Sequence, residues 1–244
     1  MKDLNTATLK EIVTDDFRVA AILEKYSLDF CCRGGRTIEQ ACMDKGVDQD
    51  SVRSEVQELL QRDESLGESY GAISIADLIR HIVRTHHSFV RKMVPVLLTH
   101  TVKVATVHGA NHPEVVKIAA AFERVAMDLQ NHMMKEEHVL FPYIHTLVNA
   151  SNGTASVQRP PFGTAKNPIR MMEAEHQAAG DELYEIRRLT SSYSPPADAC
   201  TTFKVTYQEL QEFERDLHQH VHLENNILFP KAIMLEEELL SKSA

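Results

Sequence analysis

The sequence feature that most constrains this chain is the spacing His-x-x-x-Glu, which occurs at His132/Glu136 and again at His220/Glu224. In both copies the tripeptide Leu-Phe-Pro begins four residues after the glutamate. Residues four apart lie on one face of an α-helix, with Cβ atoms about 5–6 Å apart. An imidazole and a carboxylate at this spacing can bind a metal ion from one helical turn. The repeated motif therefore predicts two helices that contribute metal ligands.

Composition favours a cytoplasmic globular protein. Hydrophobic residues make up 43% of the 244 residues and charged residues 25%, which is ordinary for a soluble domain. No apolar run reaches the ~20 residues that cross a bilayer, and the first residues lack the apolar core of a secretory signal. Four cysteines without framework spacing fit a reducing compartment. The net charge of -9 disfavours nucleic acid and anionic membrane surfaces as partners.

Residues 1–65 read as a small domain of short helices. Thr37 and Gln40 form a capping box that predicts a helix start, and a further helix is predicted to begin near residues 48–50. The polar stretch Asp63–Ser69 is predicted to be a linker to a second domain.

Residues 74–242 read as four long amphipathic helices, predicted at about 74–107, 113–149, 165–191 and 197–241. Short connections between such helices favour an up-down-up-down four-helix bundle. Pro95 is expected to kink the first of them. Since no strand pattern competes, the predicted fold class is all-α, with domains at 1–65 and 74–242.

Histidine and glutamate fall inside the predicted apolar faces of three bundle helices, at His132 with Glu136, at His176, and at His220 with Glu224. A single histidine on such a face is more often a core residue with a local hydrogen bond. Unpaired buried carboxylates are costly, however, and cations between them would remove that cost. The intervals from 132 to 176 and from 176 to 220 are both 44 residues, so an antiparallel bundle returns these histidines to one level. We therefore expect a site for two metal ions.

The first bundle helix offers two adjacent candidates, His86 and His87. The apolar periodicity centres on His86, whereas the 45-residue interval from His87 to 132 fits the spacing of the other ligands marginally better. These arguments leave the choice open.

His218 and His222 also lie four apart, but away from the apolar face of their helix, and are expected to face solvent or to lie behind the ligands. Six further histidines are not expected to bind metal: His81, His100, His108, His112, His138 and His145.

Cys31 and Cys32 form a vicinal pair in the predicted loop before Thr37. Two nearby arginines and the following helix N-terminus are expected to lower the thiol pKa. The functional hypothesis is that one or both thiolates bind iron, a cluster of a target protein or a redox partner. The alternative is two small buried hydrophobic residues. Cys42 and Cys200 are interpreted as structural.

At these motifs the chain resembles the hemerythrin-like superfamily, and over nearly its whole length it is similar to the repair-of-iron-centres family. The matching elements are Asp29-Phe30-Cys31-Cys32, His132-x-x-x-Glu136-Glu137-x-x-Leu-Phe-Pro142, Met172-Glu173-x-Glu175-His176 and His220-x-x-Leu-Glu224-Asn-Asn-x-Leu-Phe-Pro230. That family joins a vicinal-cysteine domain to a di-iron bundle. Its pattern places a ligand histidine eight residues before a proline, which points to His87 ahead of Pro95.

The resemblance implies two non-haem iron ions with a bridging oxo or hydroxo group. The implied terminal ligands are His87, His132, His176 and His220, and the implied bridging carboxylates are Glu136 and Glu224. Oxygen-carrying hemerythrins have a fifth histidine where this chain has Gly180, and an aspartate at a five-residue spacing where it has glutamate at four. Two histidines per iron therefore indicate a reactive site rather than an oxygen store. Glu175 and Asp128 are candidate proton relays.

The implied function is repair of iron–sulfur clusters damaged by nitric oxide or oxidative stress, through iron donation or redox chemistry. Iron–sulfur proteins are the implied partners, and nitric oxide or oxygen the small ligands. The alternatives are a sensor of nitric oxide or oxygen and a nitric oxide reductase, both using the same site. Whether the chain is an enzyme, and whether it forms a homodimer, are left open by the sequence.

Overall fold

The computed structural model describes residues 3–61, 70–154 and 160–242, and over these ranges the chain is helical with no strand. A single isolated bridge joins Thr8 and Thr37. The all-α prediction is confirmed. The first helices are α1 (Leu9–Asp15), α2 (Val19–Lys25), α3 (Ile38–Lys45), α4 (Gln49–Gln61) and η1 (Tyr70–Ala72). The later ones are α5 (Ile75–Ile82), η2 (Val83–His87), α6 (Ser88–His108), α7 (Glu114–Lys135), η3 (Glu136–Leu140), α8 (Phe141–Ser151), α9 (Lys166–Leu189), α10 (Thr201–Leu223), η4 (Glu224–Leu228) and α11 (Phe229–Lys242).

The chain forms two compact units, Met1–Leu78 with Val221–Ala232, and Ile79–His220 with Ile233–Ala244. In the first unit the predicted capping box at Thr37 is present, and so is a second one at Thr8. The predicted helix near residues 48–50 is α4. The predicted linker Asp63–Ser69 lies outside the described residues, and the domain boundary between 65 and 74 stays a prediction.

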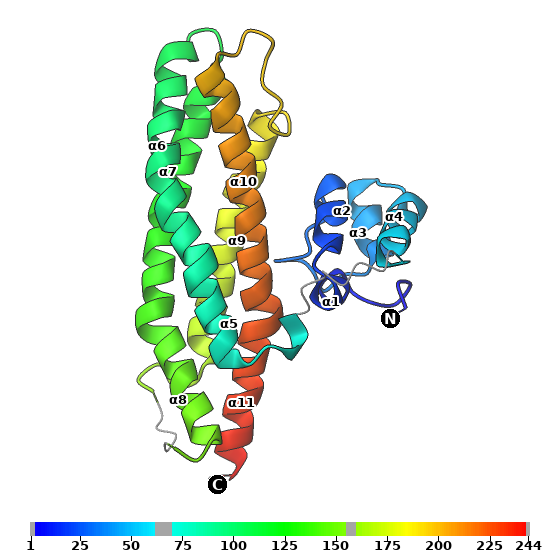
Figure 1. Cartoon of the computed structure of the whole chain (residues 1–244), viewed down its shortest axis with the longest axis vertical. Helices are drawn as coiled ribbons and strands as arrows, with labels where there is room; N and C mark the ends of the chain where they lie inside the picture. Colours follow the sequence, from blue (N-terminus) through cyan, green and yellow to red (C-terminus); the bar gives the residue numbers. More distant parts are fainter. Residues whose placement is uncertain (1–2, 62–69, 155–159, 243–244) are drawn as a thin grey trace. The chain divides into compact units, whose positions relative to one another are not determined.

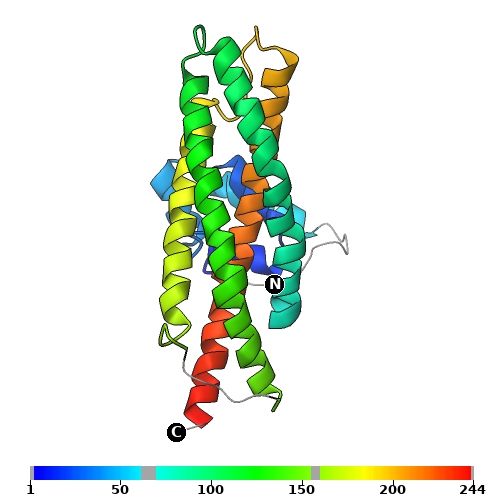
Figure 2. The same cartoon turned by 90° about the vertical axis from the view of Figure 1, so that its left-hand side faces the viewer.

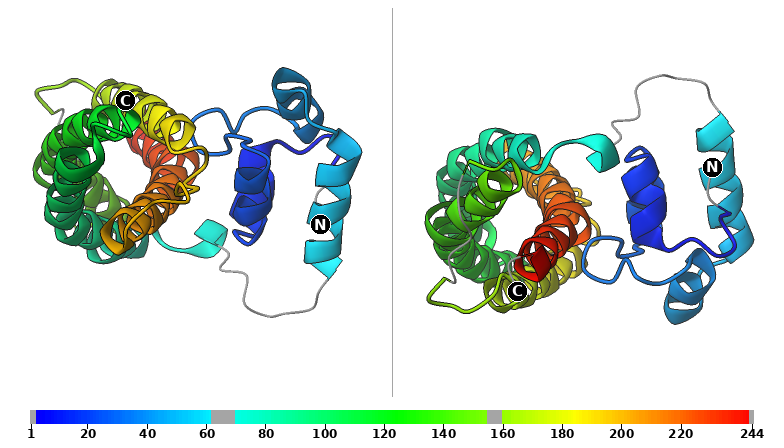
Figure 3. Two further views of the ribbon diagram at one scale, coloured as in Figure 1. Left: turned by 90° about the horizontal axis from the view of Figure 1, so that it is seen from above. Right: turned by 90° about the horizontal axis from the view of Figure 1, so that it is seen from below.

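The long helices run up, down, up and down along the chain (Figures 1 and 2). Seen end on, they surround a common interior (Figure 3). Apolar residues at helical spacing are buried on three of them: Phe122, Val125, Leu129, Met133 and Leu140 on α7 and η3; Ile169, Met172, Ala179, Leu183 and Ile186 on α9; Leu210, Phe213, Leu217, Val221 and Leu228 on α10 and η4. The last long helix was predicted to begin at about residue 197, but α10 begins at Thr201. After the two prolines the chain first makes a turn, in which the N–H of Ala199 donates to the carbonyl of Pro196.

Three of the long helices contain one π-helical turn, which the sequence analysis did not predict. These turns are η2, η3 and η4. In η3 the N–H of Phe141 donates to the carbonyl of Glu136, five residues back, and Phe229 does the same to Glu224 in η4. Pro142 and Pro230 explain the last two, since a proline removes one helical N–H and its ring clashes with the carbonyl four residues earlier. The Leu-Phe-Pro motif therefore widens the helix beside each glutamate.

The π turn η2 changes the face that the first long helix buries. Before it, Leu78, Ile79 and Ile82 are buried as predicted, but after it Val90 and Val94 are buried where the constant α-helical period predicts Phe89 and Met93. A π turn contains one extra residue, and this shifts the apolar pattern by one position. None of the helices in the described ranges combines the length and the hydropathy of a membrane span.

Candidate metal centre

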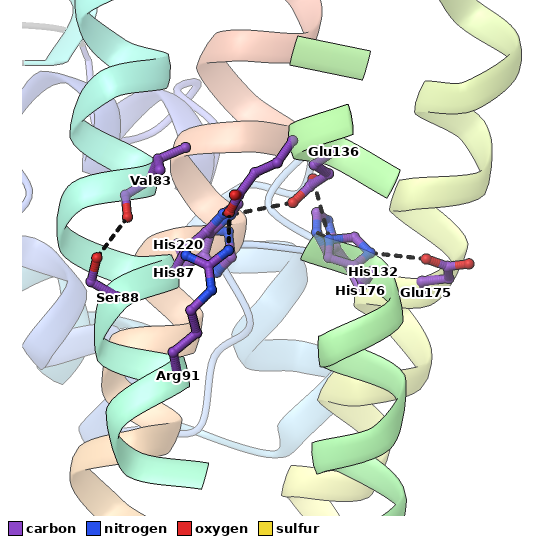
Figure 4. Close-up of polar contacts among 10 residues, drawn as sticks. Val83, His87, Ser88, Arg91, His132, Glu136, Glu175, His176 and His220 are labelled. Atoms are coloured by element: carbon purple, nitrogen blue, oxygen red, sulfur yellow. Dashed lines mark hydrogen bonds and ion pairs between the residues drawn. The ribbon is translucent and has the colours of Figure 1, made fainter. Parts of the chain in front are cut away.

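Four imidazoles meet in two pairs inside the bundle. The Nε2 atoms of His132 and His176 are 2.9 Å apart, and those of His87 and His220 are 3.2 Å apart (Figure 4). All four side chains are at most 2% exposed. Two Nε2 atoms that face each other at such distances can share one proton or bind one cation. The bundle thus contains two neighbouring positions, each with two imidazole nitrogens directed at it.

Glu136 lies between the two pairs, at the start of η3. Its Oε2 is 3.3 Å from Nε2 of His87, and its Oε1 is 3.2 Å from Nε2 of His132. The side chain is fully buried. Each carboxylate oxygen therefore faces a different imidazole pair.

Glu224 completes the arrangement from η4, one turn after His220 on the same uninterrupted helix. Two groups of four potential ligand atoms each lie within 4.8 Å of one another: His87, Glu136, His220 and Glu224 in one, and His132, Glu136, His176 and Glu224 in the other. Both glutamates are common to the two groups. We call these six residues the His/Glu centre; it contains every metal ligand that the sequence analysis named.

Carboxylates outside the centre hold two of its imidazoles through Nδ1. Nδ1 of His87 is 2.5 Å from Oε1 of Glu137, and Nδ1 of His132 is 2.9 Å from Oε2 of Glu175. Burial by itself would raise the pKa of these carboxyls, but hydrogen bonds from the imidazole and from a cationic side chain outweigh it and lower both pKa values. The ionised carboxylates fix the proton on Nδ1, which directs the Nε2 lone pair into the centre.

His86 is also buried but belongs to neither group. Its Nδ1 is 3.0 Å from Oδ1 of Asp216, and its ring is parallel to that of His220, with centroids 5.6 Å apart and planes at 6°. The structure thus places His87 rather than His86 among the potential ligands. The apolar periodicity favoured His86 because it assumed a regular α-helix, whereas both residues lie in the wide turn η2. The hydroxyl group of Ser88 donates a hydrogen bond to the carbonyl of Val83 across this turn (Figure 4).

The donor set fits a pair of divalent cations. Glu136 and Glu224 are fully buried beside four imidazole nitrogen donors, and buried carboxylates require compensating positive charge. Imidazole together with carboxylate suits iron, manganese or zinc. The residues present are therefore chemically consistent with the two iron ions that the family resemblance implies.

The proposed proton relays have different outcomes. Glu175 contacts His132, whereas Asp128 is exposed on α7, which does not support a role for Asp128 as a proton relay. The contact between Glu137 and His87 was missed, because the partners lie on different helices. One signal in the sequence could have revealed these pairs, because a cationic side chain follows each of the two histidines by about one helical turn. Arg91 follows His87 and binds Glu137, the carboxylate that also contacts His87. Lys135 follows His132 and binds Glu175, the carboxylate that also contacts His132.

The loop Asp29–Arg36, which we call the Cys–Cys loop, brings a further group of potential ligands together: Asp29, Cys31 and Cys32. The prediction of a lowered thiol pKa is wrong for Cys31. Contact with the Cys32 sulfur, burial and the nearby Asp29 carboxylate raise the pKa of Cys31 well above its ordinary value. Arg36, expected to stabilise a thiolate, instead binds Asp44. The Cys31 thiol is therefore protonated at neutral pH.

His222 is buried, which excludes the solvent-facing one of the two positions expected for it. Within the first unit its ring lies against Phe17 and Phe30, at centroid distances of 6.0 and 5.8 Å. Nδ1 of His222 is 3.1 Å from the side-chain amide of Asn226, which also donates to the Cys31 carbonyl at 3.2 Å. Burial lowers the pKa of His222 to about 4, so this imidazole is neutral. His218 is half-buried.

Comparison with known proteins agrees with this geometry. The model of the hemerythrin HHE cation binding domain matches residues 78–232, and a domain of unknown function, ScdA_N, matches residues 5–60. The chain belongs to the hemerythrin HHE family, whose defining domain binds cations.

Full-length relatives share both parts. The chain is 35% identical to the iron-sulfur cluster repair protein YtfE of Enterobacter sp. (strain 638), over 92% of this chain and 96% of that protein. It is 34% identical to a probable iron-sulfur cluster repair protein of Haemophilus influenzae and 35% identical to YtfE of Escherichia coli O81, with the same coverage of both chains. The resemblance stated from the motifs is confirmed.

Proposed function

We propose that this chain binds two iron ions at the His/Glu centre and repairs iron–sulfur clusters damaged by nitric oxide or oxidative stress. The observation that supports this most is the position of Glu136, which presents one oxygen to each imidazole pair. Relatives that cover nearly the whole chain are named iron-sulfur cluster repair proteins, and this supports the same function.

In this proposal His87 and His220 would hold one iron ion, and His132 and His176 would hold the other. Glu136 and Glu224, which are common to the two groups, would hold both ions, together with the oxo or hydroxo bridge that the resemblance implies. When bound at the His/Glu centre, iron would supply one-electron redox chemistry. Iron is also the metal that a damaged iron–sulfur cluster needs for its repair. With two imidazoles for each iron ion, the centre would leave room for a small ligand.

The protein residues prepare this centre before any metal binds. Glu137 and Glu175 keep the Nδ1 protons in place, so the Nε2 atoms are ready to bind. The ring of Phe141 stacks on His87 with centroids 5.8 Å apart, and it excludes water from that side. A Cβ at Gly180, the position of the fifth histidine in oxygen carriers, would meet no atom within 4 Å. This open space beside His176 supports access by a small ligand such as nitric oxide or oxygen.

The Cys–Cys loop takes part in repair as the contact with the damaged protein or with an electron donor, and this stays a prediction. Cys31 must lose its proton before it can act as a nucleophile or ligand. We expect Cys31→Ser/Cys32→Ser to lose repair activity while its bundle keeps its iron. Full activity in this double variant would remove the thiols from the mechanism. The cytoplasmic location expected from composition belongs to the same proposal.

The decisive experiment measures iron transfer. Protein purified without oxygen is loaded with iron, characterised by metal analysis and Mössbauer spectroscopy, and mixed with a cluster-deficient iron–sulfur enzyme whose recovered activity is followed. We expect the wild type to restore activity and Glu136→Ala to hold little iron and restore none. Glu123→Ala changes an exposed glutamate of the same helix, α7, and serves as the matched control.

The other functions would give different results with the same protein. A nitric oxide reductase would produce nitrous oxide catalytically when an electron donor is supplied. A sensor would form a stable optical adduct and retain its iron in the presence of the acceptor. Either result without recovery of the acceptor enzyme would refute the repair function.

A further inference from the structure

Another cluster of histidine, cysteine and aspartate side chains lies at the end of the bundle where α6 turns into α7, the same end at which the chain connects α9 to α10 (Figures 1 and 2). It consists of His108, His112, Asp198 and Cys200, which we call the loop-end cluster. All four belong to the unit that contains residues 79–220. His108 ends α6, and His87 precedes it by 21 residues, so the two are roughly 30 Å apart along the helix. The loop-end cluster is thus remote from the His/Glu centre.

Both imidazoles direct Nε2 at the same short segment. Nε2 of His108 is 3.2 Å from Sγ of Cys200, and Nε2 of His112 is 3.1 Å from both carboxylate oxygens of Asp198. The two rings are 6.4 Å apart between centroids. Asp198 and Cys200 are only two residues apart in sequence, so the imidazole–thiol pair and the imidazole–carboxylate pair are neighbours.

The rings are held in place, whereas their partners can move. The buried Phe203 ring packs on both imidazoles, with centroid distances of 5.2 Å to His108 and 5.6 Å to His112. Asp198 and Cys200 are exposed. Rotation about their side-chain bonds can therefore bring the thiol and the carboxylate to a common point without disturbing packed neighbours. Exposure also gives an ion direct access from solvent.

A carboxylate outside the cluster orients His112 further. Nδ1 of His112 is 3.2 Å from Oε1 of Glu114, the first residue of α7. A carboxylate behind an imidazole is the arrangement that fixes the ring and raises its basicity in metal sites. It repeats, at this end of the bundle, the contacts that Glu137 and Glu175 make in the His/Glu centre.

We propose that His108, His112, Asp198 and Cys200 bind one divalent cation of the zinc type. Two imidazoles, one thiolate and one carboxylate form a tetrahedral set of the kind that zinc prefers. Without the ion, the imidazole–thiol and imidazole–carboxylate contacts occupy the donors. On binding, the Cys200 thiol releases its proton to solvent, as does any imidazole that is protonated, and no electron is transferred. The bound ion joins the α6–α7 turn to the start of α10.

The test uses the iron-loaded full-length protein, so that the His/Glu centre is already occupied, and Co²⁺ as a spectroscopic substitute for zinc. We expect one equivalent of Co²⁺ to bind with a thiolate-to-cobalt charge-transfer band in the near ultraviolet, and stoichiometric Zn²⁺ to displace it. Cys200→Ser should abolish the band. His108→Ala and Asp198→Asn should each weaken Co²⁺ binding at least ~10-fold.

Two matched controls separate this cluster from other donors. His100→Ala alters a histidine two turns earlier on α6, which pairs with Glu209 at 2.6 Å, and it should leave Co²⁺ binding unchanged. Cys31→Ser/Cys32→Ser should keep the band. In addition, Zn²⁺ should raise the melting temperature of the wild type but not that of Cys200→Ser. The proposal is overturned if no band appears, if the band survives Cys200→Ser, or if it disappears only in the Cys31/Cys32 double variant.

Discussion

The His/Glu centre and the Cys–Cys loop both gather potential metal ligands, but their donor atoms already have different partners. In the centre, carboxylates behind His87 and His132 hold the Nδ1 protons, and the Nε2 atoms face inward. In the loop, Oδ1 of Asp29 accepts hydrogen bonds from the backbone N–H groups of Cys31 and Cys32 and from the Cys31 thiol.

This difference shows that proximity of donors alone does not define a metal site. A cation can enter the His/Glu centre while the hydrogen bonds that orient its imidazoles stay intact. A cation in the Cys–Cys loop must displace the proton of a buried thiol whose pKa is raised, and it must compete with the backbone for Asp29. We therefore expect resident metal in the bundle, and transient chemistry, where there is any, in the loop.

The largest effect should come from Glu136→Ala. Because this carboxylate is common to both groups of donors, its loss should weaken both metal positions. Substitution of residues behind metal ligands typically costs 10–100-fold in affinity, so loss of a shared ligand should cost more than ~100-fold. Iron per protein after gel filtration, with Glu123→Ala as control, measures this. Equal iron in the two variants would show that the centre does not depend on Glu136.

The second test compares one glycine from each region. A Cβ at Gly34 in the loop would lie 2.1 Å from the Phe30 carbonyl oxygen and 2.9 Å from Cβ of Lys10, whereas Gly180 in α9 has open space. Gly34→Ala should lower the free energy of unfolding by about 1–3 kcal/mol through overpacking. Gly180→Ala should raise it by about 0.5–1 kcal/mol, since alanine loses less backbone freedom in a helix. Urea denaturation measures both; similar values would mean that the loop is not tightly packed.

The third test asks whether the carboxylate behind an imidazole determines affinity. Glu175→Gln keeps the size of the side chain but removes the charge that holds Nδ1–H of His132, so iron should bind roughly 10–100-fold more weakly. Competition with a chelator gives the affinity. Glu173→Gln, an exposed residue on the same helix, is the control. If both variants bind iron as the wild type does, the orienting role of Glu175 is refuted.

The smallest effect concerns the reactivity of Cys31. Its pKa is raised in the folded protein, so at pH 7.5 the thiolate fraction is smaller than in the unfolded chain, and alkylation by iodoacetamide should be slower. The difference between the alkylation rates of the folded and the unfolded chain should become smaller as the pH rises towards the pKa of Cys31 in the folded protein. Quenched mass spectrometry of the Cys31 peptide follows this rate. Steric shielding alone would give a ratio of folded to unfolded rates that does not change with pH.

Much of the fold and of the candidate site followed from residue spacing. The apolar faces, the capping box at Thr37 and the repeated His-x-x-x-Glu motif are local patterns, and local patterns are readable in a sequence. What the sequence did not reveal depends on contacts between distant segments or on departures from regular helix. The burial of His222 and the protonation of Cys31 are of this kind, and so is the position of His87 in the ligand groups, which the apolar periodicity did not predict.

A π turn contains one residue more than a regular α-helical turn. Because the faces before and after η3 are both buried, deleting a residue between Glu136 and Leu140 should keep the two faces in line. Pro142 would need replacement at the same time, since the tighter turn would collide with its ring. The shortened protein is expected to form the bundle normally but to position the Glu136 carboxylate poorly. One deletion in η3 together with one substitution at Pro142 should therefore separate formation of the helical bundle from formation of the metal centre.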